Sequence, residues 1–229
     1  MKTAPSSHPV NAFAGVIFDL DGTLLDTLAD IGNAANAVLA QHNFPTHPIS
    51  AYRQFVGEGV RVLLTRSLPS SHRDEETIEA CLKTMQVEYP RNLNKTAQPY
   101  PGVPQVVSTL KARGLRLAVL SNKPDEFTAA CVEQFFGKGL FDPIFGLHPD
   151  RPRKPDPAGA LAISGGWGIP TPNILYVGDS GTDMQTAIAA NMYPVGVLWG
   201  YRDEAELLAA GAKELIRTPA DLGAVKPRQ

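Results

Sequence analysis

Two aspartates, Asp19 and Asp21, directly follow a short apolar run, Gly15–Phe18. The run has the composition of a strand buried in a parallel sheet, and Gly22 and Thr23 after the aspartates supply a turn. Two carboxylates this close at a strand end repel each other by about 4 kcal/mol at an effective dielectric constant near 20. A cation, a proton or a substrate must offset this repulsion, so the pair marks the predicted reactive centre.

The pair also has a suitable geometry for covalent catalysis. Side chains alternate along an extended segment, so Asp19 and Asp21 lie on the same side and Leu20 lies opposite. One carboxylate can attack phosphorus and form an aspartyl-phosphate, which divides a hydrolysis into two easier steps. The second can protonate the leaving alkoxide and then activate water, a contribution of typically about 10²–10⁴-fold. The alternative, two ordinary turn aspartates, explains each residue alone but explains the pair poorly.

Three further apolar segments end at polar or glycine residues, and together they predict the scaffold. They span residues 115–120, 174–177 and 194–199, and helical patterns with glycine or proline at their ends lie between them. Alternating strands and helices indicate an α/β fold with a doubly wound parallel sheet. Ligands bind beyond the carboxyl ends of such strands, so the polar residues there should meet at one edge of the sheet.

Residues 24–98 interrupt this alternation with helical patterns only. Apolar residues share one helical face in each of three stretches: Leu28, Ile31, Ala35, Val38 and Leu39; Val60, Leu63, Leu64 and Leu68; Ile78, Leu82, Met85 and Tyr89. An all-helical block after the first strand predicts a small inserted domain. The expected division is an α/β core of residues 1–23 and 99–229 and a helical domain of residues 24–98.

Each of the other polar segments has two interpretations. Ser121 and Asn122 could form a phosphate cradle at a helix N-terminus or an ordinary turn. Lys154 could face a phosphate or the solvent, and Arg151 and Arg153 lie close to it in the chain. Asp179 and Asp183 have the hard oxygen ligands that suit Mg²⁺, although both could simply cap a helix. Lys123 follows Asn122 directly, and Gly178 precedes Asp179 at the end of a predicted strand.

Taken together, four segments resemble the four motifs of the haloacid dehalogenase-like (HAD) superfamily of phosphohydrolases. In chain order they are Asp19-Leu20-Asp21-Gly22-Thr23, Ser121-Asn122-Lys123, Lys154-Pro155 and Gly178-Asp179-Ser180-Gly181-Thr182-Asp183. The resemblance covers the whole predicted core. It implies that the helical domain is a cap that closes over the active site.

The resemblance also implies a role for each matched residue. Asp19 would be the nucleophile and Asp21 the general acid/base. Ser121 and Lys154 would bind the transferring phosphoryl group, with Gly22, Thr23 and Asn122 next to it. The implied cofactor is Mg²⁺, held by Asp19, the backbone carbonyl of Asp21 and Asp179, with Asp183 in support.

Within the superfamily, the chain looks similar to phosphoglycolate phosphatases. The similar segments are residues 19–39, Phe55–Val60, Tyr100–Val103 and Gly196–Tyr201. This implies a Mg²⁺-dependent phosphatase that converts 2-phosphoglycolate to glycolate and phosphate. Gly57 and Gly59 would let the cap loop approach the site, and Glu58 or Arg61 would meet the non-phosphate end of the substrate. Alternatively, the two glycines simply join two cap helices.

Other functions remain open at this point. The same core and cap could serve a phosphatase for a sugar phosphate, an amino-sugar acid phosphate or pyrophosphate, or a β-phosphoglucomutase. A non-catalytic phosphate-binding module belongs to a different class, and the intact pair of Asp19 and Asp21 argues against it. Asp21 also argues against a dehalogenase, whose chemistry needs no acid at this position.

Composition limits the partners and the location. The chain has 229 residues and a formal net charge of −2, so no basic field indicates nucleic acid or an acidic membrane surface. Cys81 and Cys131 lack the spacing of a metal site and are expected to be reduced thiols. Residues 1–10 contain no apolar stretch of a signal peptide. We expect a cytoplasmic monomer or homodimer that binds a small phosphorylated metabolite and neither nucleic acid nor membrane.

Overall fold

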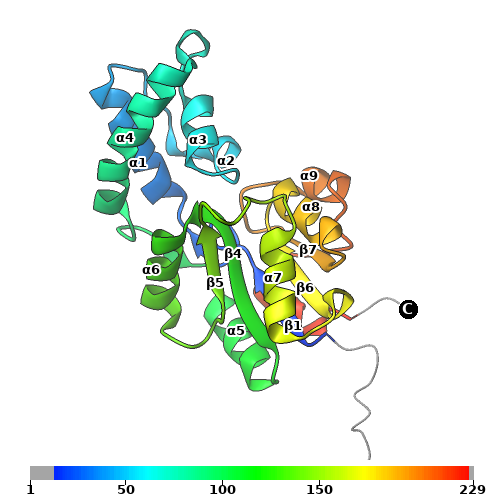
Figure 1. Ribbon diagram of the computed structural model, residues 1–229. Helices are drawn as coiled ribbons and strands as arrows, with labels where there is room; N and C mark the ends of the chain where they lie inside the picture. Colours follow the sequence, from blue (N-terminus) through cyan, green and yellow to red (C-terminus); the bar gives the residue numbers. More distant parts are fainter. Residues whose placement is uncertain (1–12, 227–229) are drawn as a thin grey trace, which may run out of the picture.

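The computed structural model describes residues 13–226, so the expectation for residues 1–10 lies outside the described residues. Its centre is a six-stranded parallel sheet in the order β5-β4-β1-β6-β7-β8 (Figure 1). The strands are β1 Gly15–Phe18, β4 Arg116–Pro124, β5 Ile144–Leu147, β6 Ile174–Gly178, β7 Tyr193–Val197 and β8 Glu214–Ile216. The predicted doubly wound α/β fold is confirmed.

Both faces of the sheet are buried because apolar residues alternate toward opposite sides of each strand. Val16 and Phe18 pack in one cluster with α5 and α6, whereas Ile17 packs in another with α7 and α8. The core helices are α5 Val103–Ala112, α6 Asp125–Phe136, α7 Ala158–Trp167, α8 Gly181–Ala189 and α9 Glu204–Ala209, with short 3₁₀ turns at η3 Thr171–Asn173 and η4 Pro219–Ala224. Helices on both faces explain why the strands read as continuous apolar runs.

Several strands and strand ends differ from the sequence prediction. Leu25–Asp26 and Gln98–Pro99 form short strands at the two ends of a stretch predicted to be helical only, and β7 ends at Val197 and not at Trp199. The strands β5 and β8 were not expected, since both are short edge strands and their side chains are only partly buried. The strand β4 continues to Pro124, so Ser121, Asn122 and Lys123 belong to the strand itself and not to a helix N-terminus. Pairing of Pro124 with Leu147 in β5, after a register irregularity, accounts for this extension.

The helical cap is defined here as the helices between residues 28 and 92, which lie beyond the carboxyl ends of the strands (Figure 1). They are α1 Leu28–Gln41, α2 Tyr52–Phe55, α3 Val60–Ser67 and α4 Glu75–Asn92, with 3₁₀ turns at η1 Ile49–Ala51 and η2 Ser70–His72. Their apolar faces form a cluster of their own. A small antiparallel sheet, β2 Leu25–Asp26 with β3 Gln98–Pro99, joins the cap to the core. The division at residues 24–98 stays a prediction.

Two smaller observations concern the cysteines and the membrane. Cys81 and Cys131 are both buried and unpaired with each other, in agreement with the expectation of free thiols. Across residues 13–226, the helices are too short or too polar to traverse a lipid bilayer.

Candidate active site

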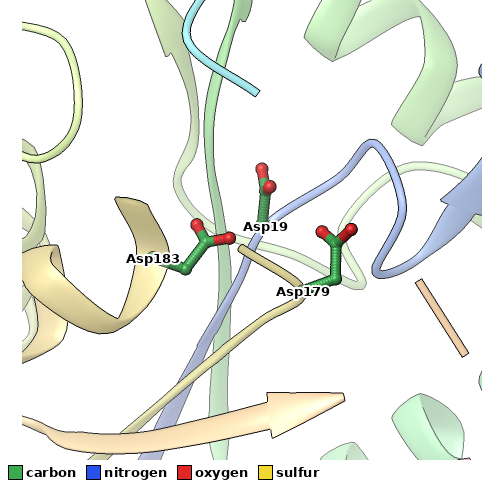
Figure 2. Close-up of side chains that lie close together, drawn as sticks. All are labelled: Asp19, Asp179 and Asp183. Carbon is green, nitrogen blue, oxygen red and sulfur yellow. The ribbon is translucent and has the colours of Figure 1, made fainter. Parts of the chain in front are cut away.

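Three buried carboxylates from separate segments meet at the carboxyl end of the sheet. Asp19 directly follows β1, Asp179 directly follows β6, and Asp183 lies in the first turn of α8. Each is at most 6% exposed, and one oxygen from each lies within 4.8 Å of the others. Figure 2 shows the three side chains gathered there. Neighbouring parallel strands β1 and β6 thus bring residues 160 positions apart into one site.

Close backbone packing holds Asp179 in place. Gly22 has a φ angle of +88°, and a Cβ atom there would lie 2.3 Å from Oδ2 of Asp179. A Cβ atom at Gly200 would lie 2.2 Å from the Asp179 Cβ atom. Thr23 donates a hydrogen bond to Oδ1 at 3.1 Å, and the backbone N–H of Tyr201 donates to Oδ2 at 2.8 Å. Glycine is therefore required at positions 22 and 200, where the backbone lies against Asp179. Each oxygen of the Asp179 carboxylate accepts one hydrogen bond and keeps a second lone pair.

Asp183 is held by its own helix and by a lysine. It forms a reciprocal capping box with Ser180, whose hydroxyl and backbone N–H both donate to Oδ2. Its other oxygen, Oδ1, accepts from the Lys154 ammonium at 2.7 Å. Both oxygens of Asp183 are thus engaged within the protein.

Lys154 is the cation that reaches the carboxylate cluster. Its side chain is 3% exposed, and its Nζ lies 2.8 Å from Oδ1 of Asp19. Asn122 fixes the Lys154 backbone by accepting from its N–H at 2.9 Å and donating to its carbonyl at 3.2 Å. Arg151 instead lies over the ring of Phe145, and Arg153 donates to the backbone carbonyl of Glu58.

The cluster carries more negative charge than its own cation balances. Burial and the charge of Asp183 raise the pKa of Asp19 well above its usual range, although Lys154 acts in the opposite direction. Burial and Asp183 also raise the pKa of Asp179 to about 7. Burial opposes the charge on Lys154, yet Asp183 and Asp19 outweigh it, so the pKa of Lys154 is raised. An additional cation bound between Asp19 and Asp179 would relieve this repulsion.

The chemistry of the donor set fits Mg²⁺. Hard cations prefer carboxylate oxygens, and Mg²⁺ usually takes one or two of them and completes its shell with water and phosphate. Asp19 and Asp179 can supply these ligands. Asp183 already binds Lys154 and Ser180, which leaves it a supporting place.

Asp21 faces a different set of partners from Asp19. Its Oδ1 accepts from Thr27 at 2.7 Å and lies 2.7 Å from Nζ of Lys123, whose side chain is 3% exposed. Burial opposes the charge on Lys123, but Asp21 outweighs it and raises the pKa of Lys123. The hydroxyl of Tyr201 contacts both the backbone N–H and the hydroxyl of Thr27. A second cation therefore holds Asp21 apart from the three-carboxylate cluster.

Sequence reasoning missed four of these residues: Lys123, Thr27, Tyr201 and Gly200. Lys123 carried a signal, since a cation in a polar run after a buried strand suits a site with excess negative charge. Thr27, Tyr201 and Gly200 carried none, because their roles depend on tertiary contacts: Tyr201 meets Thr27 across 174 positions, and Gly200 packs against Asp179.

Asp19 and Asp21 face a cavity of about 310 Å³ between core and cap. From the core it is lined by Asp19, Asp21, Ser121, Asn122, Lys123, Pro124, Glu126 and Phe127, and from the cap side by Ile31, Val56, Gly57, Gly59, Val60, Leu63, Leu82, Met85, Gln86 and Tyr89. The predicted loop glycines Gly57 and Gly59 are among these residues. Ser121 lines the cavity, and its Oγ accepts from the backbone N–H of Lys123 at 3.2 Å.

Two predicted cap residues lie elsewhere. Arg61 is 46% exposed and forms ion pairs with Glu75 and Glu79. Glu58 pairs with Arg66. Neither Arg61 nor Glu58 lines the cavity in this arrangement of the cap.

Comparison with known proteins identifies the family. The sequence matches the haloacid dehalogenase-like hydrolases over residues 16–197, which include all four motifs. The chain belongs to this family. The resemblance drawn from the sequence is thereby confirmed.

Individual relatives agree with this assignment. The chain is 35% identical to phosphoglycolate phosphatase 1 of Pseudomonas aeruginosa over 190 residues, which cover 81% of this chain and 70% of that protein. It is 35% identical over 217 residues to phosphoglycolate phosphatase of Rhodospirillum rubrum, covering 91% and 88%. A solved structure from Lactobacillus delbrueckii subsp. bulgaricus, provisionally called a phosphoglycolate phosphatase, has a TM-score of 0.89 at 29% identity and covers 95% of this chain and 100% of that one. The predicted enzyme class, a phosphatase, is confirmed.

Proposed function

We propose that this phosphatase is a Mg²⁺-dependent phosphomonoesterase that works through an aspartyl-phosphate on Asp19. One observation carries the proposal. Oδ1 of Asp19 is held by Lys154 and by the backbone N–H of Leu20 at 2.7 Å, whereas Oδ2 has no hydrogen-bond partner within residues 13–226. A nucleophilic oxygen is therefore free at the floor of a cavity whose lining also includes Asp21.

The side chains account for both halves of the reaction. Oδ2 of Asp19 attacks phosphorus, the bond from phosphorus to the ester oxygen breaks, and protonated Asp21 gives its proton to the departing alkoxide. Asp21 then accepts a proton from water, which attacks the aspartyl-phosphate and releases phosphate and free Asp19. Lys154 and Ser121 provide a positive charge and a hydroxyl next to the transferring group.

The cofactor has a defined place in this proposal. Asp19, Asp179 and the backbone carbonyl of Asp21 would hold Mg²⁺, and Asp183 would support them through Lys154. When bound, Mg²⁺ neutralises charge on the transferring phosphoryl group and on the carboxylates that would otherwise repel it. The cluster of Asp19, Asp179 and Asp183 supports this assignment.

The names of the relatives support 2-phosphoglycolate, the substrate favoured by the sequence, as the reference substrate for this activity. The segments that resemble phosphoglycolate phosphatases include motifs of the core, where the reaction is carried out, and the cap segment Phe55–Val60. The cytoplasmic location and the monomeric or dimeric state stay predictions.

The proposal is tested by phosphate release from a panel of small phosphate esters and pyrophosphate, with Mg²⁺ or with a chelator. We expect release to require the metal and to fall by at least about 10³-fold in Asp19→Asn. Because burial and repulsion disfavour the Asp19 carboxylate, this neutral isostere should keep or raise the melting temperature in chelator. Turnover that survives in Asp19→Asn, with a folded protein, would contradict the covalent mechanism.

A further inference from the structure

The cavity has two chemically different ends. Its floor carries the charged and polar side chains of the core, including Asp19 and Ser121. Its roof consists of apolar side chains from the cap, among them Leu63, Leu82 and Met85. The phosphoryl group must lie on the floor next to Asp19, so the roof surrounds the leaving group of the substrate.

The roof offers no positive charge to a leaving group. Among the described residues that line the cavity, those of the cap include no Lys, Arg or His, and their polar groups are the amide of Gln86 and the hydroxyl of Tyr89. The core adds a negative charge at Glu126, an exposed residue of the lining. Lys123 is the lining cation, and it is buried in its ion pair with Asp21.

The arginines of the cap and Arg202 bind other protein groups, and none of them is among the described residues that line the cavity. Arg61 pairs with Glu75 and Glu79, Arg66 pairs with Glu58, Arg53 donates to the backbone carbonyl of Gly200, and Arg202 donates to that of Val56. Lys154 binds Asp19 and Asp183. A second anionic group in the substrate would thus enter an apolar space without a free cation.

An apolar roof, with no free cation in the described part of the chain, favours an apolar leaving group over a charged one. A carboxylate moved from water to an apolar site without a partner loses hydration that nothing replaces, whereas an apolar group gains from leaving water. Tyr89 and Phe127 pack edge-to-face at 5.1 Å in the lining and add aromatic surface. Burial next to such surface stabilises hydrocarbon and penalises charge.

We propose that the preferred substrate is a phosphomonoester of an uncharged alcohol with an apolar portion that packs against Leu63, Leu82 and Met85. This inference rests on the proposed phosphomonoesterase function and names its substrate class. It predicts that 2-phosphoglycolate, whose departing alcohol carries a carboxylate, is not the preferred ester.

The test compares two esters of nearly the same shape. Isobutyl phosphate replaces the carboxylate oxygens of 2-phosphoglycolate by methyl groups. We expect kcat/KM for isobutyl phosphate to exceed that for 2-phosphoglycolate by at least about tenfold with Mg²⁺ present. Along the series methyl, propyl and pentyl phosphate, kcat/KM should rise by about fourfold per methylene until the roof is filled. These alcohols have similar acidity, so the series varies contact and not the leaving-group chemistry.

A charge placed on the roof should reverse the preference. Leu82→Arg, at a partly buried position of α4 in the lining, should change the ratio of the two kcat/KM values by at least about tenfold toward 2-phosphoglycolate. Val87→Arg adds the same charge to the same helix at a position that is 52% exposed and outside the lining. This control should leave the ratio unchanged.

The outcomes separate the two proposals. Preference for isobutyl phosphate together with a rising alkyl series supports an apolar leaving group, whether or not Leu82→Arg folds. Preference for 2-phosphoglycolate with a flat alkyl series overturns this inference and leaves the phosphomonoesterase proposal intact. Release of phosphate from none of the esters overturns both.

Discussion

The floor and the roof of the cavity are built on opposite principles. The floor collects buried charges, since Asp19, Asp179, Asp183 and Lys154 are all at most 6% exposed. The roof is provided by cap helices whose apolar side chains also form the cap's own core. Burying the charges of the floor costs free energy and suits one kind of chemistry. The hydrophobic contacts of the roof have no preferred direction.

This difference shows how the molecule divides its task. Most polar groups on the floor have a fixed partner, as Asp179 has in Thr23 and in the backbone N–H of Tyr201, whereas Oδ2 of Asp19 stays free among the described residues. The floor therefore determines which bond is broken. In our proposal the roof selects the alcohol that leaves, through its shape and the absence of charge in its described lining.

The largest expected effect on the floor follows from removal of its cation. Lys154→Met leaves Asp19 and Asp183 without the ammonium that lies within 2.8 Å of both. We expect the free energy of unfolding in chelator to fall by about 3–5 kcal/mol, because buried charges lose their partner. Denaturant titration measures this. The control is Arg153→Met, which removes an exposed cation next to Lys154 and should lower the free energy of unfolding by less than about 1 kcal/mol. Equal losses in both variants would show that the buried position of Lys154 has no special importance.

The second expected effect concerns proton transfer by Asp21. Lys123→Met removes the cation 2.7 Å from Asp21 and leaves Thr27 as its remaining hydrogen-bond partner. Misplacement of this acid/base should lower kcat by about 10–100-fold. The inhibition constant of inorganic phosphate should change little, since Asp19 and Lys154 are untouched. A variant with a raised KM and an unchanged kcat would assign Lys123 to substrate binding.

A smaller effect is the pH dependence of the metal-free floor. The pKa of Asp179, raised to about 7 by burial and Asp183, exceeds the value of about 3.9 in an unfolded chain. The folded state therefore binds more protons than the unfolded state between about pH 4 and 7, and its stability falls as the pH rises through this window. In chelator the melting temperature should be lower at about pH 7.5 than at about pH 5.5. Asp179→Asn should reduce this difference, and a slope as steep as in the wild type would exclude Asp179 as its source.

The smallest effect is expected outside the roof. Arg61→Gln removes ion pairs to Glu75 and Glu79 at a residue that is 46% exposed. Exposed pairs contribute little, so stability should hardly change and kcat/KM should change by less than about twofold. Kinetics with isobutyl phosphate and 2-phosphoglycolate measure it. A tenfold loss confined to 2-phosphoglycolate would restore the role that the sequence suggested for Arg61.

Much of the scaffold could be predicted because its signals are local. Apolar runs such as Ile174–Val177 and the helical faces of residues 28–39 report burial directly. The edge strands β5 and β8 escaped prediction because their residues are only partly buried. Boundaries also shifted where pairing decides them, as in the extension of β4 through Ser121 and Lys123.

The site, too, could be predicted only as far as its signals are local in the chain. The order and type of the motif residues, from Asp19 to Asp183, are properties of the chain, and they identify the family and its phosphatase chemistry. The residue types alone left Lys154, Arg151 and Arg153 open, because ion pairing depends on distances across the fold, and the resemblance favoured Lys154. It also could not locate Arg61 relative to the substrate.

The sequence by itself determined the alternating fold, the helical insertion and the carboxylates placed after buried strands, since each depends on residues close together in the chain. Only the tertiary structure decided that Lys123 pairs with Asp21, that Gly200 and Tyr201 hold Asp179, and that the cap presents an apolar roof. The physical reason is that charge pairing, close packing and cavity lining are set by contacts between distant segments. Such contacts exist only once the sheet and the cap have brought those segments together.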